Sequence, residues 1–150
     1  MPKEKRDKII RHPRENVQDN SIQCDFSVWQ DLTKTNVNNA SSLPGIYEIA
    51  IYKPNCIDEK KTTYLGMSCH LSERLKDHLL GKRFFMGDIR TSNIHPAIKI
   101  SKKRNYKIAF RFFEMKTKKL AKEFESLLLL TFDYAWNIDE NDKRIRHLFE

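Results

Sequence analysis

The chain has 150 residues, enough for one domain that buries a stable core without disulfides or a structural metal. Its 28 basic and 20 acidic side chains give a net charge of +8, which favours an anionic partner. Three cysteines without Cys-x-x-Cys spacing suggest neither a disulfide framework nor a zinc site, and no apolar run reaches the roughly 20 residues of a membrane span. We therefore expect a soluble, intracellular (cytoplasmic) protein with no membrane partner.

The N-terminal segment, residues 1–42, is predicted to be an arm that contacts DNA or supports oligomerisation. Residues 1–21 are polar and mostly charged, which is typical of a segment that is flexible or ordered by a partner, and the basic side chains from Lys3 to Arg14 suit DNA. Residues 36–42, rich in Asn and Ser, predict a loop. Between these parts a short amphipathic helix is indicated by the apolar residues Phe26, Val28, Trp29 and Leu32.

The main domain is predicted at residues 43–137, with 138–150 as a C-terminal tail. It opens with a run of β-branched and aromatic residues that ends at a Lys-Pro-Asn turn, typical of a strand in a hairpin whose loop extends around Pro54. Leucines at helical spacing followed by Gly81 indicate a helix. The expected elements are strands at 45–52, 62–66 and 106–114, and helices at 71–80, 96–101 and 117–132. This order predicts an α+β fold, a small three-stranded antiparallel sheet flanked by helices, with an N-terminal extension.

A basic stretch covers residues 99–119, where nine basic side chains stand against Glu114 alone. Aromatic residues between them fit a strand whose polar edge follows a phosphate backbone. Taken alone, a charge run is more often a solvated face. The candidate DNA contacts are Lys99, Lys102, Lys103 and Arg104, and also His95, which precedes the basic stretch and has two open uses, the start of a helix or a contact with a phosphate.

Several short motifs occur in a fixed order with compatible spacing. Arg74 lies eight residues after a Tyr-Leu-Gly motif, His78 lies four residues later, and Glu125 lies twelve residues before Asn137. The full set is Gly45-Ile46-Tyr47, Tyr64-Leu65-Gly66, Arg74, His78, Glu125 and Asn137. Over roughly residues 43–137 this set resembles the GIY-YIG endonuclease family, in its phage or restriction-like members.

Two departures from the family pattern concern the opening hairpin. The stretch between the two motif tyrosines, residues 48–63, is longer than usual, which again indicates an extended surface loop. Some members carry a lysine directly after the second motif glycine, where this chain has Met67. A mechanism that depends on that lysine is therefore not expected here.

The resemblance implies a DNA endonuclease that uses Mg²⁺ or Mn²⁺ and leaves 5′-phosphate and 3′-hydroxyl ends. Tyr47 would orient or deprotonate the attacking water, which requires its pKa to fall, because a free tyrosine near 10 is a poor base. Arg74 would bind the scissile phosphate, Tyr64 would hydrogen-bond it, and His78 would assist Tyr47. Glu125 would hold the metal, while Gly45, Gly66 and Asn137 would shape the site.

The metal carboxylate is chosen independently by helical periodicity. At about 100° per residue, Glu123 falls on the polar face beside Lys119, whereas Glu125 falls at the border of the apolar arc. A carboxylate that leans toward a core needs a partner to offset its desolvation, and one carboxylate suffices for Mg²⁺.

Other functions stay open at this point. Each site residue has an ordinary structural use when taken alone, and the fold also suits a catalytically silent nucleic-acid-binding module or a DNA-repair nuclease. The expected partner is double-stranded DNA. One site per chain makes a homodimer or higher symmetric oligomer the expected assembly if both strands are cut.

Overall fold

The computed structural model describes residues 11–17, 22 and 24–137. The expectations for residues 3–10 and for the tail at 138–150 lie outside these residues. Within the described part, the antiparallel sheet and flanking helices confirm the predicted α+β fold. The same part contains no helix long and apolar enough to cross a membrane, and Cys24, Cys56 and Cys69 are free thiols.

The main sheet is built around strand β3, Gly45–Tyr52, which is buried along its whole length. β3 pairs antiparallel with β4, Lys61–Ser68, and with β7, Lys107–Glu114. A two-residue strand, β2 at Gln30–Asp31, extends the sheet to the order β2-β7-β3-β4. The three predicted strands are confirmed, and β2 adds a short edge that sequence patterns did not indicate.

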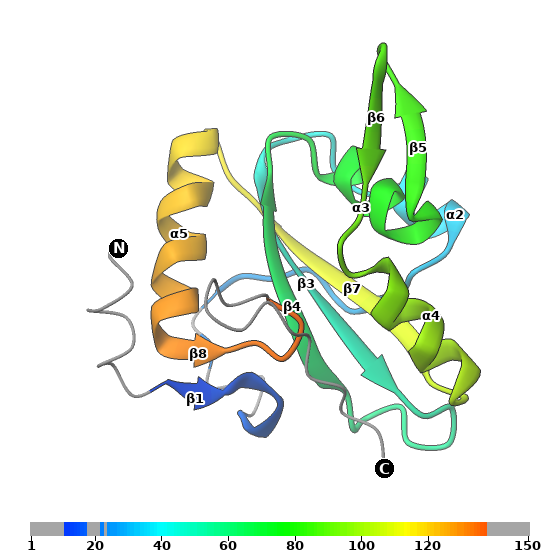
Figure 1. The fold of residues 1–150 in the computed structure, drawn as a ribbon. Helices are drawn as coiled ribbons and strands as arrows, with labels where there is room; N and C mark the ends of the chain where they lie inside the picture. The colour runs from blue at the N-terminus through cyan, green and yellow to red at the C-terminus, as the bar shows by residue number, and fades with distance from the viewer. Residues whose placement is uncertain (1–10, 18–21, 23, 138–150) are drawn as a thin grey trace.

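Helices cover both faces of this sheet (Figure 1). Helix α5, Lys118–Thr131, packs on one face, where Ile46, Leu65 and Ala121 belong to one apolar cluster. The other face carries α2, Lys34–Asn38, with α3, Leu71–Leu80, and α4, His95–Lys103. Tyr47 and Ile49 point to that second face, as the two-residue period of a strand requires. The predicted helices at 71–80, 96–101 and 117–132 are thereby confirmed.

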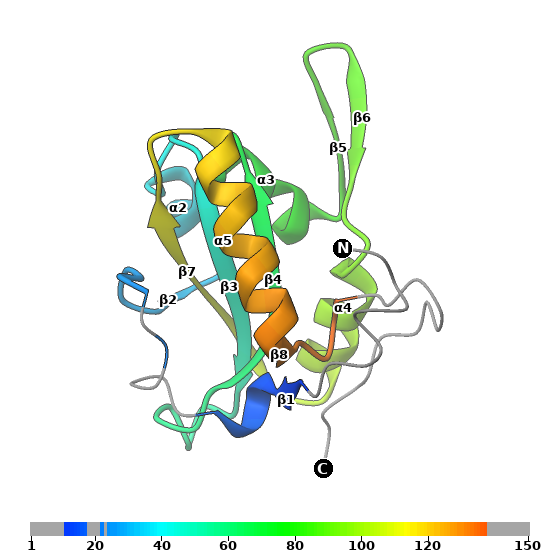
Figure 2. The same cartoon turned by 90° about the vertical axis from the view of Figure 1, so that its left-hand side faces the viewer.

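A second hairpin projects from the body of the molecule (Figures 1 and 2). It consists of β5, Lys82–Phe85, and β6, Asp88–Thr91, joined by Met86 and Gly87. Both turn residues have positive φ, 49° and 85°, as a two-residue hairpin turn of type I′ requires. No sequence pattern predicted this hairpin.

The short helix of the N-terminal segment lies elsewhere than expected. Residues around Phe26 to Leu32 form no helix, and the helix is α2 at Lys34–Asn38, so the loop predicted over 36–42 is also partly wrong. The Thr33 side chain accepts a hydrogen bond from the Asn36 backbone N–H and caps α2 at its N-terminus. Leu32 and Val37 are buried in the core beside Ile49.

A buried charge cluster joins the N-terminal segment to the sheet. Glu48 is fully buried and accepts hydrogen bonds from Arg14 Nε at 3.1 Å, Arg111 Nη2 at 2.6 Å and the Tyr134 hydroxyl at 2.6 Å. β1, His12–Pro13, pairs with β8, Phe132–Asp133, and leads into the short 3-10 helix η1, Arg14–Asn16. Because its side chain is 1% exposed and paired, Arg14 cannot contact DNA as predicted.

The basic stretch is also used differently from the expectation. β7 lies between β2 and β3, and Arg111 is buried against Glu48 between the rings of Phe26 and Trp29. The interpretation of this strand as a polar edge facing a phosphate backbone is therefore wrong. The proposed DNA contact or oligomerisation by residues 1–42 stays a prediction.

Candidate active site

Two tyrosines meet on the face of the sheet that carries α3. Tyr47 comes from β3 and Tyr64 from β4, with ring centroids 6.1 Å apart. Gly66 lies directly opposite Tyr47 in the strand register. A Cβ at position 66 would stand 2.2 Å from the Tyr47 hydroxyl, so only glycine lets this hydroxyl lie over the backbone of β4.

His78 holds the Tyr47 hydroxyl from the other side. Its Nε2 is 2.7 Å from the Tyr47 oxygen, and its Nδ1 is 2.6 Å from Ser92 Oγ. Burial, and then the charge of Arg74, lower the pKa of His78 to about 3. The imidazole is therefore neutral at ordinary pH, with one nitrogen that donates and one that accepts.

The Tyr47 hydroxyl keeps its proton in this environment. Burial, followed by the neighbouring Tyr64, raises the pKa of Tyr47 well above its ordinary value, and Arg74 opposes that rise without reversing it. The expectation that the surroundings depress this pKa is wrong for the structure as it stands. If Tyr47 acts as a base, its hydroxyl must give up its own proton as it takes one from water. His78 Nε2 is the neighbour positioned to receive that proton.

Arg74 approaches both tyrosines from α3 and is held by the projecting hairpin. Its charge acts on the pKa of Tyr47 and of Tyr64, while its Nη1 donates to Asp77 Oδ2 and to the Thr91 carbonyl, each at 3.1 Å. The Arg74 side chain is about one-quarter exposed. A guanidinium that is fixed at one end and reachable at the other suits a phosphate ligand.

Asp77 is the fully buried anchor beneath Arg74. Burial alone would raise the pKa of Asp77, but hydrogen bonds from Arg83, Arg90 and Arg74 lower it below its usual value. Arg83 Nε donates at 2.7 Å and Arg90 Nε at 2.8 Å. Asp77 therefore stays ionised and fixes the hairpin relative to Arg74.

Glu125 lies on α5, the helix that packs on the opposite face of the sheet from α3. Its charge raises the pKa of Tyr64, so the carboxylate lies within electrostatic range of that hydroxyl. Its side chain is 17% exposed, and burial raises the pKa of Glu125 while Lys122, 3.8 Å away, partly opposes this. Glu123, two residues earlier, is exposed. The structure thus separates the two glutamates as helical periodicity predicted.

A metal ion fits Glu125 by its chemistry. Within residues 11–17, 22 and 24–137, no group of three His, Cys, Asp or Glu side chains could hold a metal ion. Mg²⁺ needs no such cage, because one or two carboxylates with waters and substrate phosphates are its usual ligands. Glu125 is half-buried with a long ion pair as its charge partner, which leaves its desolvation poorly compensated.

Asn137 and Gly45 contact the backbone of the strands that carry or flank the two tyrosines. The Asn137 side chain accepts from the Leu65 N–H at 3.0 Å and donates to the Leu65 carbonyl at 2.9 Å, so it braces β4 beside Tyr64. A Cβ at Gly45 would lie 2.3 Å from the Phe113 carbonyl oxygen. Both residues thus act on strand geometry, in line with the shaping role expected for them.

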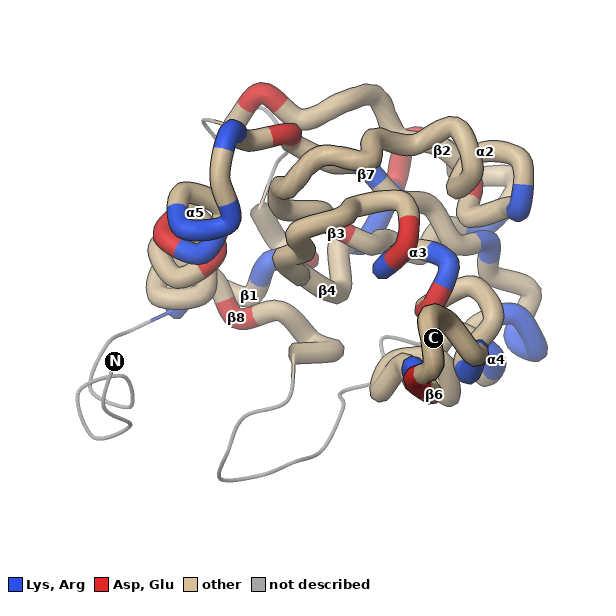
Figure 3. Tube along the Cα trace, turned by 90° about the horizontal axis from the view of Figure 1, so that it is seen from above, with Lys and Arg blue, Asp and Glu red and all other residues tan. Residues whose placement is uncertain are grey.

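The expected DNA contacts are divided between two places. His95 packs its ring against Gly81, and its Nδ1 lies 2.9 Å from the His78 carbonyl oxygen, so it lies next to the site. Lys99 is exposed in α4, and Lys102, Lys103 and Arg104 are exposed where α4 ends. Figure 3 shows basic positions in blue on α4. Lys102, Lys103 and Arg104 come shortly before Lys107, which pairs with Tyr52 at the end of β3. They therefore lie toward the opposite end of β3 from the one nearer Tyr47.

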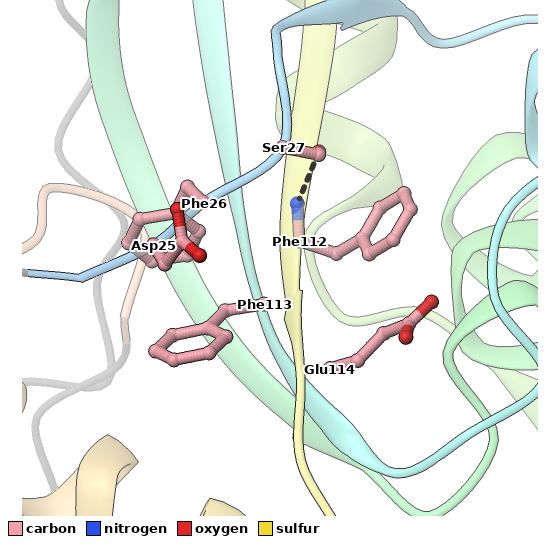
Figure 4. Close-up of a pocket in the computed structure, with 6 residues that line it drawn as sticks. All are labelled: Asp25, Phe26, Ser27, Phe112, Phe113 and Glu114. Atoms are coloured by element: carbon pink, nitrogen blue, oxygen red, sulfur yellow. Dashed lines mark hydrogen bonds between the residues drawn. The ribbon is translucent and has the colours of Figure 1, made fainter.

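A surface pocket elsewhere involves none of the predicted site residues. It is lined by Asp25, Phe26 and Ser27 together with Phe112, Phe113 and Glu114 of β7 (Figure 4). Ser27 Oγ accepts from the Phe112 N–H at 3.1 Å, a hydrogen bond between two of the lining residues. The pocket therefore lies where residues 25–27 meet β7 and is not part of the candidate site.

Sequence reasoning missed two residues of the site. Asp77 stands three positions after Arg74, a spacing that indicates an ion pair on a helix. Ser92 gave no signal, because it reaches His78 only through the unpredicted hairpin.

Comparison with known proteins gives one match. The family model described as GIY-YIG domain-containing protein matches residues 25–148. No curated protein and no solved structure matches the chain significantly.

Proposed function

The chain belongs to the GIY-YIG family of nuclease domains, and we propose that it is a Mg²⁺-dependent DNA endonuclease of the phage or restriction-like type. The observation that supports this most is the cluster of Tyr47, Tyr64 and His78, whose ring centroids lie 5.5 to 6.1 Å from one another, with Arg74 fixed on the same helix as His78 by its hydrogen bond to Asp77. Two hydroxyls, one guanidinium and one carboxylate from four elements are the groups that phosphodiester hydrolysis needs.

In the proposed reaction, water attacks the phosphorus opposite the 3′-oxygen that leaves, the departing oxygen takes a proton from a solvent water, and the proton removed from the attacking water returns to solvent at the end of the cycle. As the new P–O bond forms, a water proton passes to the Tyr47 oxygen, and the Tyr47 proton passes to His78 Nε2, 2.7 Å away. Ser92 Oγ, 2.6 Å from His78 Nδ1, fixes the ring during this transfer. Both groups are neutral before the phosphate arrives, as the directions of their pKa shifts require. The lowered pKa of His78 opposes its protonation, so the transfer depends on the negative charge of the bound phosphate, which favours the imidazolium.

The charge that develops on the phosphate is met by two groups. Arg74 donates N–H bonds to the non-bridging oxygens from the position fixed by Asp77, and the Tyr64 hydroxyl donates beside it. A divalent ion held by Glu125 would supply charge stabilisation at the departing 3′-oxygen. The substrate proposed from the net positive charge and the family is double-stranded DNA.

Supercoiled plasmid tests this function directly. We expect nicked or linear product with Mg²⁺ and none after addition of a chelator. Sequencing of the ends should find 5′-phosphates. A protein that binds the plasmid but never nicks it with Mg²⁺ or Mn²⁺ would be a silent binding module instead.

A further inference from the structure

The projecting hairpin of β5 and β6 carries an apolar outer face. Phe84, Met86 and Ile89 are 73%, 86% and 62% exposed. Phe84 pairs with Ile89 across the two strands, so both side chains lie on the same face, and Met86 occupies the turn. Three large apolar side chains on one protrusion indicate a binding element rather than a core element.

The turn itself favours this interpretation. Type I′ turns prefer Asn-Gly, because both central residues adopt positive φ. Here Met86 takes the first position at φ 49°, a conformation that non-glycine residues other than Asn and Asp adopt rarely. A methionine at this position does not favour the turn, so we infer that its exposed thioether side chain serves binding and not folding.

The opposite face of the hairpin connects to the proposed active site. Arg83 and Arg90, which pair across the strands, both donate to Asp77 in α3. Asp77 accepts from Arg74 as well, and the Thr91 carbonyl at the base of β6 is a second acceptor for Arg74. The hairpin is therefore fixed relative to the residue proposed to hold the scissile phosphate.

The charges of the hairpin suit a nucleic acid. At its base, Lys82, Arg83 and Arg90 join Arg74 and Lys76 of α3. These five basic side chains exceed the two carboxylates there, Glu73 and Asp77, with which Arg83 and Arg90 are ion-paired, and Asp88 lies near the tip. A cationic base attracts the phosphates, and an apolar tip is the part that proteins insert between base steps, most often as Phe, Leu, Ile or Met. The base of the hairpin is fixed to Arg74, the residue proposed to bind the scissile phosphate. Binding to a membrane or to another protein would not require this connection.

On the basis of the proposed nuclease function, we propose that this hairpin is a wedge that enters the DNA duplex beside the cleavage site and unstacks a base step. The length of β5, four residues at about 3.4 Å each, gives a reach on the order of 14 Å. At a rise of about 3.4 Å per base, this reach corresponds to roughly four base steps. The unstacked step therefore lies within about four base pairs of the scissile phosphate, and duplex deformability contributes to site choice.

The test uses duplexes that contain a mapped cut position and 2-aminopurine, a base whose fluorescence rises when it is unstacked. The label is placed at successive steps on both sides of the cut. All proteins carry Glu125→Ala, so that DNA stays intact in the presence of Mg²⁺. The wedge variant is Phe84→Thr with Met86→Asn, because Thr suits a strand and Asn suits the type I′ turn. The control, Val28→Ser with Ile57→Ser, replaces two similarly exposed apolar residues elsewhere.

We expect a fluorescence rise at one or two labelled positions near the cut, lost in the wedge variant and kept in the control. With Glu125 restored, the wedge variant should cleave with a kcat/KM about tenfold lower, while the control cleaves normally. DNA binding without any fluorescence rise, or an equal rise in the wedge variant, would overturn the wedge and leave the nuclease intact.

The remaining outcomes are also decisive. If the unsubstituted protein neither binds nor cuts DNA, the proposed function and the wedge fail together. If the wedge variant cuts normally but changes its mass in light scattering, the hairpin is an interface between copies of this chain, and the wedge is rejected.

Discussion

Tyr47 has little freedom, because it is buried and its hydroxyl lies against both Gly66 and His78. The short contact with His78 and the close approach over Gly66 fix the oxygen at one point in space. A hydroxyl that is held this firmly and kept neutral by burial can exchange protons only with the neighbours that touch it. The proposed proton path follows from this enclosure.

Replacing Tyr47 by Phe should lower kcat for plasmid cleavage by about 10²–10⁴-fold, because the proton transfer from water is lost. The affinity for DNA should change little. Tyr52→Phe is the matched control, since Tyr52 lies on the same strand and its hydroxyl donates to Asp31, remote from the site. Equal activity of the Tyr47→Phe protein and the unsubstituted protein would remove Tyr47 from the reaction.

His78 gives the protein a pH-dependent stability. Its pKa is about 3 in the folded chain and about 6.5 when unfolded, so the unfolded state binds the extra proton as pH falls. The stabilisation that comes from neutral His78 is complete above about pH 7 and is lost progressively below about pH 6.5. Between pH 7 and 5 the free energy of unfolding should fall by about 2 kcal/mol from this group.

Urea denaturation at the two pH values, compared with His78→Gln, measures this effect. The raised pKa of Glu125 changes the free energy of unfolding in the opposite direction as pH falls, so the difference between the two proteins is the quantity to compare. An equal loss of stability in the two proteins would show that His78 is not buried as a neutral ring.

Among the elements, those with strong local patterns could be predicted. β3 is a continuous run of strand-forming residues, and α3 has leucines at helical spacing and ends at Gly81, whose φ of 84° and contact with His95 require glycine. Glu125 could be distinguished from Glu123 because α5 is long enough for its apolar periodicity to assign each glutamate to a face of the helix.

Other elements depend on contacts that sequence patterns do not contain. β5 and β6 are short and expose apolar residues, so they lack the alternation of a half-buried hairpin, and their turn begins with methionine rather than asparagine. Arg14 and Arg111 carry charges that predict exposure, but each is buried because Glu48 compensates it. The long-range pairing, 34 residues apart for Arg14, is invisible to local periodicity.

The Glu48 cluster makes β3, β7 and the N-terminal segment depend on one another. Glu48→Ala would leave the guanidinium groups of Arg14 and Arg111 buried without their carboxylate, at a cost of about 3–5 kcal/mol in the free energy of unfolding. Glu59→Ala, at an exposed position of the loop after β3, should change it by less than about 0.5 kcal/mol. Urea denaturation compares the two, and a similar small effect for both would show that the cluster is not buried.

For the whole molecule, the N-terminal segment cannot be removed to test assembly. A chain that lacks residues 1–40 loses Arg14 together with Leu32 and Val37, which belong to the core, and we expect it to unfold by circular dichroism. A folded truncated protein with native helix content would contradict this account of the core.

The proposed homodimer or higher symmetric oligomer is better tested on the intact chain. Light scattering at several concentrations, with and without uncut duplex, should give at least twice the mass of 17.9 kDa under conditions that cut both strands. A monomer that makes double-strand cuts under single-hit conditions would contradict the assembly.

The central claim is that Glu125 completes, from the far face of the sheet, a site whose other groups come from β3, β4 and α3. The most direct test compares Glu125→Ala with Glu123→Ala in plasmid cleavage with Mg²⁺, alongside DNA binding measured separately. We predict that Glu125→Ala abolishes cleavage and keeps DNA binding, while Glu123→Ala, on the exposed face of the same helix, changes neither. Full cleavage by the Glu125→Ala protein would contradict the account.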